Sequence, residues 1–110
     1  MGLTKTEIFS HHQNKLATFF RVLAHPARIS ILQHLILVKE CICGDLVKEI
    51  GLSQPTISQH LKELKNLDLI KGNIEGTSIC YCINEEKWQE IKLIFKEFFD
   101  QDISIKKECC

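Results

Sequence analysis

Proline and glycine are scarce in this chain of 110 residues, with only two and five copies. This scarcity excludes collagen-like and low-complexity sequence. The hydrophobic content of 45% is too high for a chain that is mainly disordered, and it is sufficient for a buried core. We therefore expect one globular domain spanning residues 1–110.

Long hydrophobic runs and a secretory leader are also lacking. The most apolar stretch, residues 29–38, is interrupted by Ser30, Gln33 and His34. It falls short of the roughly 18 apolar residues that a membrane helix needs. Residues 1–7 contain no basic segment followed by an apolar block. These features predict a cytoplasmic protein without membrane contact.

The chain has no excess of charge and no familiar catalytic motif. Its 14 basic residues equal its 14 acidic residues, which argues against a protein that coats nucleic acid by charge alone. Any DNA binding would have to be local and specific. The sequence contains no Cys-x-x-Cys, no glycine loop that cradles phosphate and no nucleophile elbow. We therefore expect no enzymatic activity.

Hydrophobic periodicity predicts a mainly α-helical fold with one small β-hairpin. The second predicted helix is apolar almost all round, so we expect it to be buried centrally. Gly51 ends the third helix and Ser53 caps the fourth. The expected helices cover about 4–23, 26–38, 45–50, 53–65 and 85–100, the expected strands cover about 69–74 and 78–83, and residues 101–110 form a tail. This order is typical of a winged helix-turn-helix.

The fourth predicted helix carries the candidate DNA-binding residues. Its outer face offers short polar side chains that suit base edges or phosphates in the major groove, and two lysines that suit phosphates. The alternative is a merely solvated face. His60 lies between these roles, because it could face DNA or pack against the scaffold. The candidates are Gln54, Thr56, Ser58, Gln59, His60, Lys62 and Lys65.

Two segments and a dipeptide resemble the ArsR/SmtB family of metal-sensing repressors: FRVLAHPARISIL at 20–32, LSQPTISQHLKEL at 52–64, and Leu69-Ile70. The resemblance covers about residues 15–84. It implies a dimeric repressor that leaves its operator DNA when an inducer binds, with Gln54, Ser58 and Gln59 nearest the bases. The hairpin departs from the family pattern. Many relatives carry Arg or Lys there, whereas this chain has Asn73-Ile74-Glu75-Gly76-Thr77, and Glu75 would repel phosphate. We therefore expect DNA affinity to depend on Arg28, Lys62, Lys65 and Lys71.

Large aromatic residues mark the first and last predicted helices. One small domain cannot easily shield all of these rings from water, which favours a homodimer. The alternative is that they close the core of a single chain. The family resemblance implies dimerisation through these helices, residues 1–23 and 85–100. The residues are Phe9, Phe19, Phe20, Trp88, Phe95, Phe98 and Phe99.

Six cysteines are many for a chain without a secretory leader, and they indicate metal or thiol chemistry rather than a disulfide scaffold. Cys41 and Cys43 lie where the third helix is expected to begin, and a helix N-terminus favours thiolate, a ligand for soft metal ions. Buried cysteines that pack as small hydrophobes are the alternative. ECICGDL at 40–46 resembles the Cys-Val-Cys-Asp-Leu box of arsenic-sensing and cadmium- or lead-sensing family members.

This box lacks the further cysteine that the arsenic-type members usually have, because Leu46 and Val47 follow. As(III) binds three thiolates, so we expect the third to come from Cys109 or Cys110 in the tail. A non-functional tail is the alternative. Cys80 and Cys82 point to one face of a strand and are expected to pack inside the wing, with a second thiol site as the alternative.

The sequence thus predicts a repressor that As(III) or Sb(III) releases from DNA, with no obligatory cofactor. The alternatives are a repressor of the same fold that senses oxidants or persulfides through thiols, or one that senses cadmium or lead. The last helix contains no histidine, so we do not expect the zinc or nickel site that the resemblance would otherwise imply there.

Overall fold

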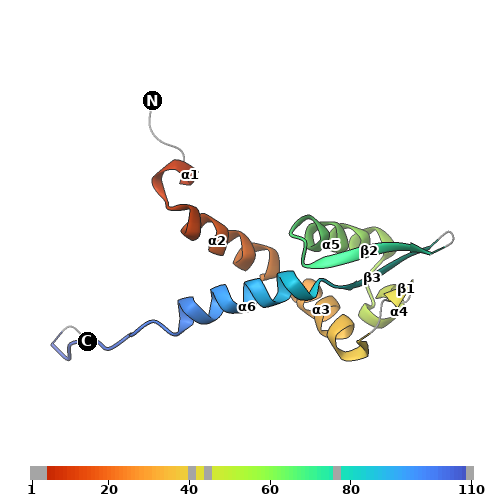
Figure 1. Ribbon diagram of the computed structural model, residues 1–110. Helices are drawn as coiled ribbons and strands as arrows, with labels where there is room; N and C mark the ends of the chain where they lie inside the picture. Colours follow the sequence, from red (N-terminus) through yellow and green to blue (C-terminus); the bar gives the residue numbers. More distant parts are fainter. Residues whose placement is uncertain (1–4, 40–41, 44–45, 76–77, 109–110) are drawn as a thin grey trace.

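The computed structural model describes residues 5–39, 42–43, 46–75 and 78–108 (Figure 1). Within these ranges the chain is mainly helical, and a β-hairpin follows the helix-turn-helix, as predicted. The elements are α1 (Lys5–Ile8), α2 (His11–Leu23), α3 (Pro26–Val38), β1 (Ile42–Cys43), α4 (Leu46–Ile50), α5 (Gln54–Asn66), β2 (Ile70–Glu75), β3 (Ser78–Ile83) and α6 (Glu85–Phe99).

The first predicted helix is divided in two at Ser10. The backbone N–H of Gln13 donates to Ser10 Oγ at 3.0 Å, and the Ser10 N–H donates to Gln13 Oε1 at 2.9 Å. This reciprocal capping box satisfies two donors that a helix start leaves open. The prediction of one continuous helix over 4–23 was therefore wrong, although Ser-x-x-Gln is itself a signal for a new helix.

Helix α3 forms part of the core with one face only. His25 caps it, since its Nδ1 accepts the Ala27 N–H at 3.1 Å, and Pro26 occupies the first turn. Ile31 and Leu35 are fully buried, whereas Leu37 is 78% exposed. The expected burial all round is therefore wrong. The other two exposed apolar residues of this helix are Ile29 and Ile36.

A third strand, β1, lies in the stretch that the sequence predicted as a connector. The sheet has the order β1-β3-β2 and both pairings are antiparallel. In the β1–β3 register Ile42 pairs with Tyr81 and Cys43 pairs with Cys80. A strand of two residues carries no alternation in its sequence, so only the pairing with a distant partner reveals it.

The core joins the helix-turn-helix to the start of the hairpin. Residues with 2% exposure or less come from α3, α5, β2, β3 and the position before β2; they are Ile31, Leu35, Ile57, Leu64, Leu69, Ile70 and Cys80. Helix α5 is therefore fixed on its apolar side and displays its polar side. In the described ranges, no helix combines the length and apolar character needed to cross a membrane.

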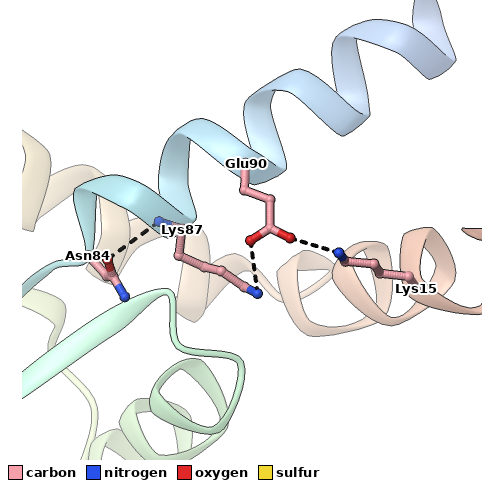
Figure 2. Close-up of polar contacts among 4 residues, drawn as sticks. All are labelled: Lys15, Asn84, Lys87 and Glu90. Carbon is pink, nitrogen blue, oxygen red and sulfur yellow. Dashed lines mark hydrogen bonds and ion pairs between the residues drawn. The ribbon is translucent and has the colours of Figure 1, made fainter.

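Helices α2 and α6 pack together on the side of the molecule opposite the hairpin tip (Figure 1). The rings of Phe20 and Phe95 stack with centroids 4.6 Å apart, and Phe19 meets Phe95 edge-on at 6.5 Å. Figure 2 shows the polar part of this contact, in which Glu90 accepts from Lys15 at 2.7 Å and pairs with Lys87 at 3.1 Å. The two flanking helices thus form one aromatic unit with an ion pair beside it.

Candidate DNA-binding face and cysteine site

The turn between α4 and α5 depends on Gly51. Its φ of +83° lies in the left-handed region, which side chains other than glycine rarely adopt. A Cβ on this residue would meet nothing within 4 Å, so the requirement is one of backbone conformation and not of space. The Gly51 N–H donates to the Val47 carbonyl at 2.9 Å and closes α4. This turn sets the direction of α5.

Helix α5 begins after Ser53, as predicted. Ser53 has the extended backbone of an N-cap, and Pro55 lies in the first turn, where a missing N–H costs nothing. The Ser53 side chain makes no capping bond; its Oγ lies 3.0 Å from Thr56 Oγ1. The start of the helix therefore presents a pair of hydroxyl groups to solvent.

The outward face of α5 carries the polar residues that the sequence singled out. Gln54 Nε2 donates to Ser58 Oγ at 3.0 Å, and Gln59 Nε2 donates to Glu63 Oε1 at 3.2 Å. Neighbours one turn apart thus hold both amides in place. All six of the following side chains are exposed: Gln54, Thr56, Ser58, Gln59, Lys62 and Lys65.

The basic residues expected to support DNA binding divide into two groups. Lys62, Lys65 and Lys71 are exposed, and Lys65 reaches the hairpin, because a Cβ on Gly72 would lie 3.3 Å from its Nζ. Arg28 is turned inward instead. Its Nη1 donates to the Val22 carbonyl at 3.0 Å, so the expected phosphate contact of Arg28 has no support from its position.

His60 belongs to the scaffold side of α5 and is only 7% exposed. Its Nδ1 accepts a hydrogen bond from Arg28 Nε at 3.1 Å, and the His25 ring lies 4.3 Å away between centroids. Burial, reinforced by the charges of His25 and Arg28, lowers the pKa of His60 below its usual 6.5. Of the two orientations that the sequence left open, the structure favours packing against the scaffold.

The cysteines that the structure describes lie in two neighbouring strands, Cys43 in β1 and Cys80 and Cys82 in β3. Cys43 lies in β1, three positions before the start of α4, and its backbone pairs with β3. Cys80 is 0% exposed and disulfide-bonded, and Cys82 is partly buried. The burial of Cys80 agrees with the expected packing inside the wing, but its disulfide was not predicted.

Three of the four predicted metal ligands, Cys41, Cys109 and Cys110, lie outside the described residues, as does the side chain of the fourth, Cys43. Among the side chains that are described, no three of His, Cys, Asp and Glu gather closely enough to hold a metal ion.

The family model described as "Bacterial regulatory protein, arsR family" matches residues 25–71. An arsenical resistance operon repressor of Staphylococcus xylosus is 32% identical over 91 residues, which are 83% of this chain and 79% of that repressor. A probable mercury resistance operon repressor of Streptomyces lividans is 28% identical over 109 residues, which are 99% of this chain and 86% of that protein.

Solved structures show the same fold. NolR from Sinorhizobium fredii superposes with a TM-score of 0.63 at 29% identity, covering 93% of this chain and all of that one. The transcriptional repressor BigR from Xylella fastidiosa gives 0.61 at 26% identity, covering 84% of this chain and 92% of that one. The winged helix-turn-helix fold and the similarity to these relatives lead to the same conclusion. The chain belongs to the arsR family of bacterial regulatory proteins and is a transcriptional repressor rather than an enzyme.

Proposed function

We propose that this chain is a homodimeric repressor that binds operator DNA through α5 and releases it when As(III) or Sb(III) binds thiolates that include Cys41 and Cys43. The position of Cys43 carries this proposal. Cys43 is paired with the wing strand β3 and lies just before α4, whose Leu46 is buried at 4% exposure. A ligand at Cys43 therefore acts on the first helix of the DNA-binding unit.

The DNA-binding half of the proposal is supported by the division of α5 into two faces. Ile57 and Leu64 are at most 1% exposed and fix the helix to the core. Gln54, Ser58 and Gln59 lie on the exposed face, where amides can read base edges in a major groove. Lys62 and Lys65 continue that face and can contact phosphates.

The dimer half of the proposal is supported by the aromatic unit of α2 and α6. Phe98 is 43% exposed and Phe99 is 66% exposed, although both contact Phe20 within one chain. A second copy would cover these rings. A two-fold dimer would then place two α5 helices on half-sites about one helical turn, roughly 10 bp, apart.

Release from DNA follows from the contacts of α4. This helix packs against α3 and α5, so a displacement at its start is passed to the DNA-binding helix. The ion can shift the balance between two conformations only by its difference in affinity for them. Couplings of this kind are about 1–3 kcal/mol, so operator affinity should fall by about 5–150-fold. Similarity to an arsenical resistance operon repressor and to a probable mercury resistance operon repressor supports a thiophilic inducer.

The test begins with an operator selected from random-sequence DNA by the reduced protein. Fluorescence anisotropy then measures affinity for that DNA with and without arsenite, in the native protein and in Cys41→Ser and Cys43→Ser. Both substitutions should abolish release while leaving DNA affinity unchanged. Cys82→Ser is the matched control, since it removes a thiol from the same sheet, and it should release normally. Normal release by Cys41→Ser and Cys43→Ser would refute the proposal.

Regulation by thiol oxidation is a second candidate, favoured by the disulfide at Cys80. In that case an oxidant alone would release the DNA and a reductant would restore binding. The same anisotropy assay with hydrogen peroxide in place of arsenite separates the two signals. A phosphine reductant prevents thiol oxidation, so release of DNA by arsenite in its presence would support As(III) sensing and not oxidant sensing.

A further inference from the structure

Cys80 lies opposite Cys43 in the sheet. The β1–β3 register makes their Cα atoms direct partners, whereas Cys82 has Lys71 of β2 as its partner. Directly opposed residues of antiparallel strands have Cα atoms about 4.5–5.5 Å apart. A disulfide requires about 4.4–6.8 Å. The register thus indicates Cys43 as the residue that the Cys80 disulfide reaches.

We propose that Cys80 supplies the third thiolate of the soft-ion site, from the wing strand β3, and that its disulfide with Cys43 is the oxidised, closed form of that site. The inference rests on the proposed function, because it completes the ligand set of Cys41 and Cys43. It places the third ligand in the folded domain and leaves the tail cysteines, Cys109 and Cys110, without that role.

The disulfide itself supports a shared ion site. Two sulfur atoms that are close enough to form a disulfide need to move only slightly apart after reduction to bind the same thiophilic ion. Cys80 is fully buried, so its sulfur is held in one place by the surrounding core and loses little freedom when the ion binds. Cys43 and Cys80 then contribute from facing strands, and Cys41 contributes from the same Cys-x-Cys sequence as Cys43.

Oxidation and ion binding use the same sulfur atoms and therefore exclude each other. A small-molecule disulfide such as oxidised glutathione can close the site by thiol–disulfide exchange. The Cys43 and Cys80 thiols lose two protons and two electrons and form one S–S bond, while the S–S bond of the small molecule breaks and takes them up as two thiols. The closed form offers neither sulfur as a thiolate. Oxidised protein should therefore not capture arsenite.

X-ray absorption on arsenite-loaded protein, reduced with a phosphine that does not compete as a thiol, tests the ligand set. The native protein should show three sulfur atoms around arsenic, Cys80→Ala two, and the matched control Cys82→Ala three. Circular dichroism checks that each variant is folded. Three sulfur atoms in Cys80→Ala, or two in Cys82→Ala, would overturn the assignment of Cys80.

A second measurement uses the native chain, so it does not depend on how a buried substitution is tolerated. Peptide mapping after treatment with oxidised glutathione should find Cys43 joined to Cys80, and arsenite should no longer bind until a reductant is added. A bridge from Cys80 to any other cysteine, or undiminished arsenite binding by the bridged protein, would contradict the inference. If Cys41→Ser and Cys43→Ser still release DNA normally, the proposed function itself fails; if they do not but Cys80→Ala keeps three sulfur atoms, only this inference fails.

Discussion

At the scale of single residues, His60 makes folding stability depend on pH. Its folded-state pKa is lowered by burial and by His25 and Arg28, so the unfolded chain binds a proton more readily than the folded one. This contribution to stability is fully present above about pH 6.5, the pKa of the unfolded group, and is lost as the pH falls from there through the folded-state pKa. Urea unfolding of the native protein should therefore show a falling free energy below pH 6.5.

The His60→Gln variant isolates this effect. Glutamine can accept from Arg28 Nε but does not titrate, so the fall in stability between pH 6.5 and 5 should become shallower. His12→Gln is the control, because His12 is exposed on α2, and it should keep the full pH dependence of the native protein. Identical pH profiles for native protein and His60→Gln would show that His60 does not carry the effect.

Two residues of α5 should affect DNA binding in different ways. Lys62 is exposed and suited to a phosphate, so Lys62→Gln should weaken binding to all sequences alike and reduce the salt slope by about one. Gln59→Ala should instead cost about 1–3 kcal/mol on the selected operator and relax the preference at one base pair. Anisotropy titrations at several salt concentrations separate the two. An unchanged salt slope in Lys62→Gln would argue against a phosphate contact.

At the scale of elements, the ion pair between α2 and α6 should add a small amount of stability. Hydrogen bonds from Lys15 first, and then Lys87, lower the pKa of Glu90. The contribution is present above the unfolded-state pKa of about 4.5 and is lost as the pH falls through the lower folded-state value. Because these side chains are 23–39% exposed, water and salt screen the pair and its worth is at most about 0.5–1 kcal/mol.

Glu90→Gln measured by urea unfolding at pH 7 should show this loss at low salt and most of it should vanish at 1 M salt. Asp100→Asn is a suitable control, because its pair with Lys96 is 58–67% exposed and joins α6 only to its own C-cap residue. It should leave stability unchanged within error. A large, salt-independent loss in Glu90→Gln would mean that packing of the side chain, and not its charge, matters.

The same scale separates what the sequence could predict from what it could not. Helices α4 and α5, the hairpin and α6 have strong local signals, such as Gly51, the Ser53 cap and the stripe of aromatic residues, and all were predicted within two residues. Strand β1 was missed because it consists of two residues held by β3. The exposed side of α3 was missed because a helix with apolar residues on most of its sides does not reveal which of them a single chain covers.

The candidate site was predictable to a similar degree. The exposed polar positions of α5 follow from helical periodicity, because its apolar residues identify the buried face and thereby the opposite, exposed face. The inward position of His60 depends on Arg28, which lies on another helix, so spacing alone left it open. The partnership of Cys43 and Cys80 depends on strand register, a long-range property that neither Cys-x-Cys sequence contains.

At the scale of the whole molecule, a single copy is more extended than a compact domain of its length. Its radius of gyration is 17.7 Å, whereas a compact domain of this length has about 13 Å. Helix α1, the far end of α6 and residues 101–108 extend away from the wing (Figure 1). Exposed apolar side chains concentrate on these parts: Ile8, Phe9, Leu93, Phe98, Phe99, Ile103 and Ile105.

Replacing Phe98 and Phe99 by serine should therefore convert the proposed dimer to monomers. A partner would bury only the exposed part of each ring, which is worth about 1–2 kcal/mol, and two copies lose four rings. Sedimentation velocity over a range of protein concentrations measures the change. The control is Leu37→Ser, which removes an even more exposed apolar residue from α3, away from the aromatic unit of α2 and α6, and should leave the dimer intact. If the double variant still sediments as a dimer, the aromatic unit does not form the interface. If Leu37→Ser dissociates, the partner copy binds to α3. In the expected case the monomer should also lose operator affinity while keeping a folded helix-turn-helix, since two linked half-sites bind DNA far more tightly than one.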